Sequence, residues 1–184
     1  MKNNLTYKIT LTAVLSAFAT IAFILESLFP PLFIPGARMG LSNVFILLTV
    51  YLVGGRYAIA ALVVKTIIGS LFSGNVSSLM YSLPSGLVAL CLELALIYLV
   101  KKVSTLCVSV TGAVVNTTLQ NLTFCLVTGT SEYLSYLPYL ALVGVISGAI
   151  VGVAVYLILL KAPTNDKNNQ AASNAAKCDK GEKI

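Results

Sequence analysis

Long apolar segments, separated by short stretches of glycine, proline or charge, constrain this chain more than any other feature of its sequence. Between residues 10 and 100 the charged residues are Glu26, Arg38, Arg56, Lys65 and Glu93. The chain of 184 residues is 58% hydrophobic and 10% charged, whereas a soluble domain carries about 25% charged residues. So few charges cannot cover a surface in water, and the sequence therefore predicts an all-α integral membrane protein.

Six segments are predicted to form transmembrane helices, since a spanning helix needs about 20 mainly apolar residues. They are Tyr7–Phe29, Met39–Val53, Tyr57–Phe72, Met80–Val100, Ser104–Val127 and Leu137–Leu160. The second segment is short for a full span, so either the proline-rich loop before it dips into the protein or the helix is partly buried. One transmembrane domain is expected over residues 1–161, followed by a disordered cytoplasmic tail over residues 162–184.

Positive charge predicts the orientation of the helices in the membrane. One set of helix ends carries Lys2, Lys8, Arg56, Lys101, Lys102 and Lys161. The opposite set carries Arg38, with Glu132 on the same side. Because cytoplasmic loops are enriched in lysine and arginine, both termini are predicted to lie in the cytoplasm.

Two ionisable residues are predicted to lie at similar depth inside the membrane, where charges are costly and usually face the protein interior. Lys65 comes nine residues after Arg56, and Glu93 comes eight residues before Lys101. At the helical rise, both are about 12 to 13 Å from the same side of the membrane. We expect them to pair, either as a buried ion pair that sets helix register or as a contact for a coupling ion or substrate.

Glu26 and Arg38 lie on either side of the proline-rich loop, near the outer end of the first predicted helix. In one interpretation they bracket an entrance for a charged small molecule, because the donors of an arginine match carboxylate and phosphate. In the other they form a surface pair or an interfacial anchor.

Amide side chains gather on one face of the fifth predicted helix. Asn116 and Gln120 are four residues apart and share that face, in the outer half of the membrane. Buried amides must find partners, so they either bond to neighbouring helices or form the polar wall of a substrate-binding pocket. Asn43, Asn75 and Tyr81 fall near the same side and are expected to join such a pocket.

Small residues recur at helical spacing in the first and last predicted helices. Ala13 and Ala17 form an AxxxA pair, which lets another helix approach closely. They are predicted either to contact a partner or to pack within the chain. Gly144, Gly148 and Gly152 form a GxxxGxxxG run, which is predicted to be an internal packing groove rather than a dimer face.

Several kinds of chemistry are excluded by residues that the sequence lacks. Without histidine, neither a Ser-His-Asp nor a Cys-His set can form, and the cysteines include no CxxC pair for a metal. No Walker A loop is present for ATP hydrolysis. The aspartates are Asp166 and Asp179, both in the tail, so no aspartate-rich motif for magnesium diphosphate chemistry exists. No catalytic residue, metal or cofactor is predicted.

Three stretches carry a resemblance to known bacterial membrane proteins. Residues 8–17, KITLTAVLSA, resemble the first helix of substrate-binding (S) components of energy-coupling factor transporters. Residues 26–31, ESLFPP, and 35–43, PGARMGLSN, are similar to the Gx transporter family, which is also labelled heptaprenyl diphosphate synthase component I. The resemblance covers about residues 8–160 and implies a location in the bacterial cell membrane.

The two family labels imply different functions. An S component is a small protein of six helices that captures a vitamin or similar molecule. Its AxxxA face docks on a shared energy-coupling transmembrane subunit, and separate ATPases supply the energy. This likeness implies that Glu26 and Arg38 belong to a gate loop. Asn116 and Gln120 are assigned to the pocket from their depth alone. The synthase label implies a non-catalytic accessory subunit in prenyl diphosphate synthesis for menaquinone.

Overall fold

The protein is a bundle of α-helices throughout the part that the computed structural model describes, residues 5–28, 40–74, 76–100, 103–129, 135 and 137–161. The helices are α1 (Leu5–Leu28), α2 (Asn43–Leu52), α3 (Gly55–Phe72), α4 (Ser77–Leu99), α5 (Thr105–Thr128) and α6 (Leu137–Lys161). The predicted all-α class and the order of six helices are confirmed. The helix α4 starts at Ser77 rather than at Met80, where its apolar segment begins.

Within the described residues, five helices are long and apolar enough to cross a membrane, and these are α1, α3, α4, α5 and α6. The exception is α2, which has 10 residues. All residues from Ile46 to Tyr51 are buried, so the short second helix is explained by burial within the protein. The proline-rich loop before it lies outside the described residues.

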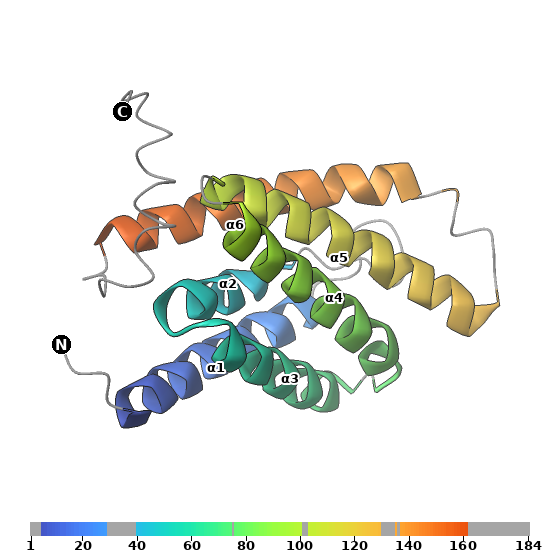
Figure 1. The fold of residues 1–184 in the computed structure, drawn as a ribbon. Coiled ribbons are helices and arrows are strands. Elements are labelled where there is room, and N and C mark those ends of the chain that lie inside the picture. The colour runs from blue at the N-terminus through green and yellow to red at the C-terminus, as the bar shows by residue number, and fades with distance from the viewer. Residues whose placement is uncertain are drawn as a thin grey trace.

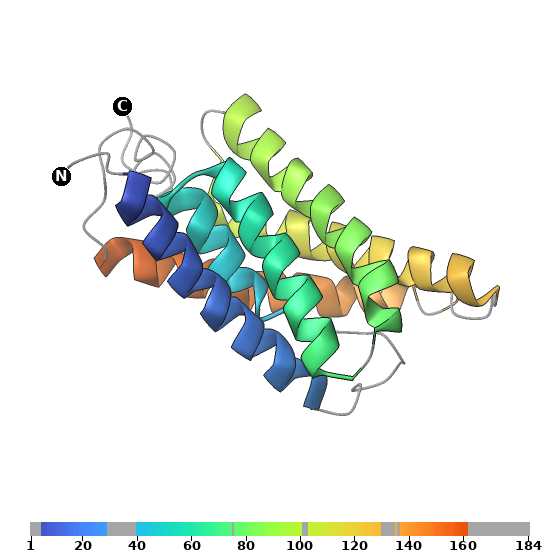
Figure 2. The ribbon, with the colours of Figure 1, turned by 90° about the horizontal axis from the view of Figure 1, so that it is seen from below.

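Consecutive helices run in alternating directions, and the start of α1 and the end of α6 lie at the same end of the bundle (Figures 1 and 2). Glycines permit two of the tight turns between them. Gly54, with φ 124°, links α2 to α3, and Gly74, with φ 69°, follows α3. Side chains rarely adopt such positive φ values. The placement of both termini in the cytoplasm stays a prediction.

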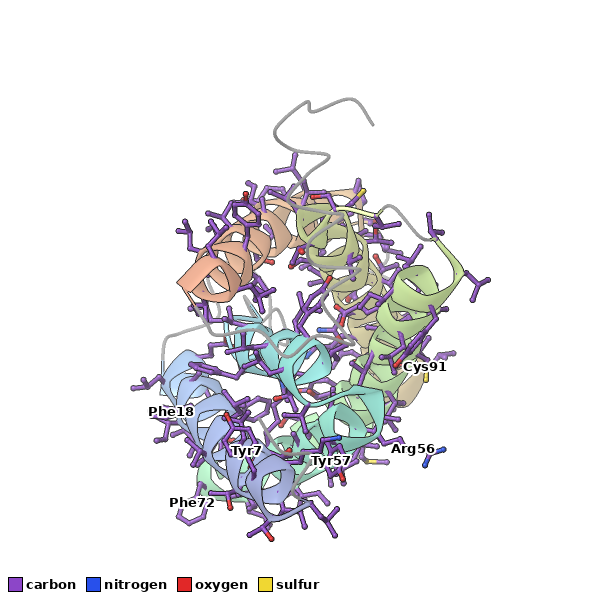
Figure 3. All side chains as sticks on the ribbon, turned by 60° about the vertical axis from the view of Figure 1, so that its left-hand side comes forward. Tyr7, Phe18, Arg56, Tyr57, Phe72 and Cys91 are labelled. Carbon is purple, nitrogen blue, oxygen red and sulfur yellow. The ribbon has the colours of Figure 1, made fainter. Side chains whose placement is uncertain are left out.

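The short helix α2 occupies the middle of the bundle (Figure 3). One of its faces packs with α1, α5 and α6 in an apolar cluster that includes Leu48 and Val155. The other packs with α1, α3 and α4 in a second cluster that includes Ile46 and Leu90. Outside this core, large apolar side chains such as Phe18 and Phe72 point away from the bundle (Figure 3), as expected for a surface that faces lipid.

The closest helix packing is between α5 and α6, and glycines make it possible. A Cβ atom at Gly148 would lie 2.7 Å from Val110 Cα, and one at Gly152 would lie 3.0 Å from Leu106 Cα. The Ser109 hydroxyl also donates a hydrogen bond of 2.8 Å to the Gly148 carbonyl. The prediction that the GxxxGxxxG run is an internal packing groove is therefore confirmed.

Candidate binding site

Lys65 lies at the centre of a polar region in the bundle interior, with 4% of its surface exposed. Its ammonium group donates hydrogen bonds of 3.1 Å to the Ser42 hydroxyl and 2.7 Å to the Asn43 side-chain oxygen. Lys65 is ten residues into α3, about 15 Å along its axis. Because Ser42 and Asn43 begin α2, that helix starts at the level of the middle of α3.

Glu26, near the end of α1, also contacts the start of α2. Its carboxylate accepts a hydrogen bond of 2.9 Å from the backbone N–H of Ser42. Ser42 precedes α2 as its N-cap, and its own side chain makes no capping hydrogen bond. A carboxylate from another helix thus occupies a helix N-terminus, where negative charge is stabilised. Arg38, with which the sequence grouped Glu26, lies outside the described residues.

Two cavities adjoin these side chains. The Lys65 cavity lies among α1 to α5, and its polar lining is Glu26, Ser42, Asn43, Lys65, Thr66, Ser82, Asn116 and Gln120. The Glu93 cavity lies among α2, α4, α5 and α6, and its polar lining is Asn43, Glu93, Ser109, Asn116, Thr117 and Ser147. Gly40, Asn43 and Asn116 line both, so the cavities are two arms of one polar interior. Each arm is narrow and offers room for water only.

Gln120 carries a buried amide nitrogen without a hydrogen-bond partner among the described residues. The residue is 5% exposed, it lines the Lys65 cavity, and its Nε2 atom has no hydrogen-bond partner among the described residues. A buried donor left in this way costs about 1–3 kcal/mol. Such a cost indicates a place for a group that the described residues do not provide.

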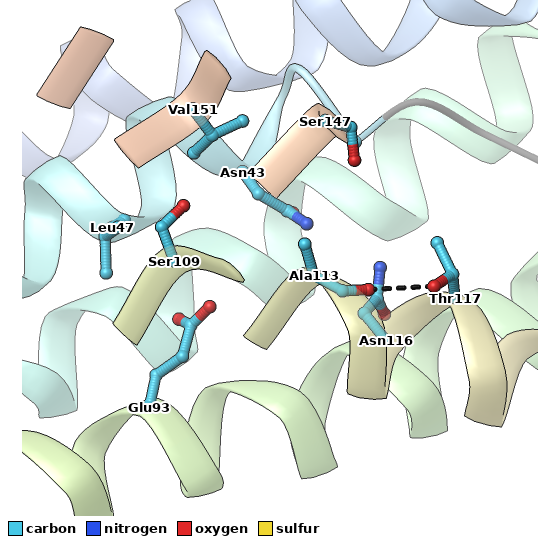
Figure 4. Close-up of a pocket in the computed structure, with 10 residues that line it drawn as sticks. Asn43, Leu47, Glu93, Ser109, Ala113, Asn116, Thr117, Ser147 and Val151 are labelled. Carbon is cyan, nitrogen blue, oxygen red and sulfur yellow. Dashed lines mark hydrogen bonds between the residues drawn. The ribbon is translucent and has the colours of Figure 1, made fainter. Parts of the chain in front are cut away.

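Glu93 projects from α4 into the other arm of the interior and is 9% exposed. Figure 4 shows Glu93 lining the same pocket as Asn43 and Asn116. Gly112 in α5 makes room for it, because a Cβ atom there would collide with the Glu93 carboxylate. Lys65 acts electrostatically on Glu93, and direct pairing of the two stays a prediction.

The remaining predicted site residues have different surroundings. Tyr81 packs edge-on against Phe124, with ring centroids 5.6 Å apart, and it lines neither of the two cavities. Asn75 lies outside the described residues. Ala13 and Ala17 are exposed on α1, which does not support packing within the chain. Their contact with a partner stays a prediction.

Sequence reasoning missed the small hydroxyl residues of the interior. Ser42 contacts both Glu26 and Lys65, and Ser109 joins α5 to α6. Serine and threonine are common in membrane helices, so composition does not single them out. For Ser42, the signal was its position at a helix start after Gly40.

No metal centre is found in the described part of the chain, where no three His, Cys, Asp or Glu side chains are grouped to hold an ion.

A family model described as heptaprenyl diphosphate synthase component I matches residues 15–158. The match includes both arms of the polar interior. No curated protein and no solved structure matches the chain.

Proposed function

The chain belongs to the heptaprenyl diphosphate synthase component I family, and from its polar interior we propose that it is a membrane-embedded binding protein for small-molecule uptake. The observation that carries this proposal is the buried Gln120 amide, which has no partner among the described residues and lines the same cavity as Lys65. A protein that used these side chains for helix packing alone would satisfy the Gln120 amide nitrogen internally, as it does the Lys65 ammonium group.

The position of the polar interior supports binding of a molecule within the membrane. Ionisable residues in spanning helices are rare and mark substrate or ion pathways. Here Lys65 is contributed by α3 and Glu93 by α4, both in helices long enough to span. Since the arms have room for water only, a ligand enters by moving the start of α2. That start is joined to α1 and α3 by hydrogen bonds from Ser42 and Lys65.

The proposed partners are those of an S component, namely a shared energy-coupling transmembrane subunit and ATPases. Two features favour this assignment. The described residues form six helices, with the start of α1 and the end of α6 close together (Figure 1), and Ala13 and Ala17 are exposed on α1. Exposed small residues at this spacing allow close approach of a partner helix.

The test is affinity purification of the whole chain in mild detergent, with copurifying proteins identified by mass spectrometry. We expect a transmembrane subunit with paired ATPases, and we expect both to be lost in Ala13→Trp/Ala17→Trp. Val153→Trp is the control, because Val153 is 46% exposed on α6 and the substitution places a tryptophan on another lipid-facing surface. Equal recovery from both variants would contradict docking through α1.

A second candidate is a non-catalytic accessory subunit of a prenyl diphosphate synthase, possessing no aspartate-rich motif of its own. The observation that favours it is the description of the family whose model matches residues 15–158. The same purification distinguishes the candidates. Recovery of a soluble prenyltransferase in place of ATPases would overturn the uptake proposal and establish the accessory function.

A further inference from the structure

Hydrogen-bond donors from three helices converge on the Lys65 cavity. They are the ammonium group of Lys65 in α3, the Nε2 amide of Gln120 in α5 and the backbone N–H of Ser42 at the start of α2. An ammonium group and an amide nitrogen donate and do not accept. A ligand group that binds these donors must therefore be rich in acceptors.

The chain already places one anion among these donors. The Glu26 carboxylate lines the same cavity and accepts the Ser42 N–H at 2.9 Å. The helix that begins there, α2, has 10 residues, and its N-terminus carries partial positive charge that favours an anion. The Glu26 contact shows that a carboxylate fits at this position. An anionic ligand would compete with Glu26 for it.

The neighbouring arm has the opposite preference. Glu93 lines it together with Ser109 and Ser147, and its described lining includes no cationic side chain, so an anion finds no opposite charge there. The arms meet at Asn43 and Asn116, whose amides both donate and accept. The two arms therefore differ in the charge that they favour, and an anionic group is favoured in the Lys65 cavity.

We propose that the ligand of this interior carries an anionic group, a carboxylate or a phosphate, which binds Lys65 and Gln120 and displaces the Glu26 carboxylate from the start of α2. The inference rests on the proposed binding function and names the chemical class of its ligand. Glu26 then acts as an internal substitute for the ligand, so the empty site is not left with unopposed positive charge.

The test uses the purified full chain in detergent with three probes, which are acetate, inorganic phosphate and inorganic diphosphate. Binding is measured by calorimetry and by the shift of thermal unfolding, with chloride at equal ionic strength as the reference. Binding of acetate alone identifies a carboxylate site, and binding of phosphate or diphosphate identifies a phosphate site. If no probe binds more strongly than chloride, the inference is overturned.

Variants locate the binding. We expect affinity for the bound probe to fall about tenfold or more in Lys65→Met and in Gln120→Met, as for loss of a hydrogen bond to a charged group. Arg56→Met is the matched control, since Arg56 is exposed at the start of α3, and it should keep its affinity. Glu26→Gln should raise affinity, because it removes the competing charge.

Gln120→Met keeps the test decisive if Lys65→Met does not fold, because it removes a buried donor that has no partner among the described residues. Unchanged anion affinity in Gln120→Met, or an equal loss in Arg56→Met, would overturn the inference. A failure of this inference can be distinguished from a failure of the proposed function. Recovery of a transmembrane subunit and ATPases with the chain would still support uptake of a ligand that is not an anion.

Discussion

The interior of the bundle differs on the two sides of Ser42, where α2 begins. On one side, α2 fills the centre with apolar side chains such as Ile46 and Leu48, packed in two clusters. On the other, the centre is polar and contains the Lys65 cavity, and the Glu93 cavity extends along α2 to Leu47. With 10 residues, α2 is about 15 Å long, whereas α1, with 24 residues, is about 36 Å long. The site thus exists because the second helix occupies half of the bundle.

Polarity alone does not distinguish the two regions. Thr49 in α2 is 0% exposed, yet its hydroxyl donates a hydrogen bond of 2.7 Å to the Phe45 carbonyl. The polar group in the apolar region is therefore satisfied by its own helix. Gln120 has no such partner for Nε2 among the described residues. The Ser78 hydroxyl is also buried without a partner among the described residues, but Ser78 lines neither cavity. The difference teaches that an unsatisfied buried donor that also lines a cavity, as Gln120 does, marks the candidate site.

The largest effect on stability is expected in the apolar region. Ile46 is 2% exposed and packs in the cluster with Ala58 and Leu90. Ile46→Ala should lower the free energy of unfolding by about 2–5 kcal/mol, because it removes buried methyl groups and leaves a cavity. Reversible unfolding in mixed detergent micelles measures this. Val153→Ala, at an exposed position on α6, is the control, and equal losses in the two variants would contradict the assignment of a packed core.

A smaller loss is expected at the α5–α6 contact, which borders both regions. In Gly148→Ala the added Cβ atom would lie 2.7 Å from Val110 Cα, and backbone cannot move away cheaply. The free energy of unfolding should fall by about 1–3 kcal/mol. At Gly86 the nearest atom would be a flexible Leu62 methyl at 3.4 Å, so Gly86→Ala should cost less in the same unfolding assay. The reverse order would argue against glycine-mediated packing of α5 on α6.

Ser109→Ala should have a still smaller effect. It removes the hydrogen bond from Ser109 to the Gly148 carbonyl, at the border of the Glu93 cavity, and should cost about 0.5–1.5 kcal/mol. Thr111→Ala is the control, since the Thr111 hydroxyl is exposed and bonds within α5 to the Cys107 carbonyl. If both variants unfold alike, the bond between helices contributes nothing measurable.

The smallest effect, and one of opposite sign, is expected in the polar region. Gln120→Met removes a donor that has no partner among the described residues, so the free energy of unfolding should stay unchanged or rise by about 1 kcal/mol. The measurement is the same unfolding assay without ligand. A loss comparable to that of Ile46→Ala would show that the amide has a structural role and would remove the contrast between the regions.

Helix boundaries could be predicted where glycine ends a helix. Gly54 separates α2 from α3, and Gly129, with φ 68°, follows α5. The start of α4 could not be predicted, because Ser77 and Ser78 are polar and precede its apolar segment. Hydropathy locates the part of a helix that faces lipid, and a helix extends beyond it wherever the backbone continues its hydrogen bonds.

The sequence by itself determined that the chain is a helical membrane protein and that Lys65 and Glu93 lie within it. Hydropathy and charge are properties of each segment, so whether a segment is stable in lipid depends mainly on its own residues and not on the helices beside it. The tertiary structure alone decided that Lys65 bonds to Ser42 and Asn43, and that Gln120 faces a cavity. Those contacts depend on how each helix is rotated and where α2 begins, which only the mutual packing of the helices sets.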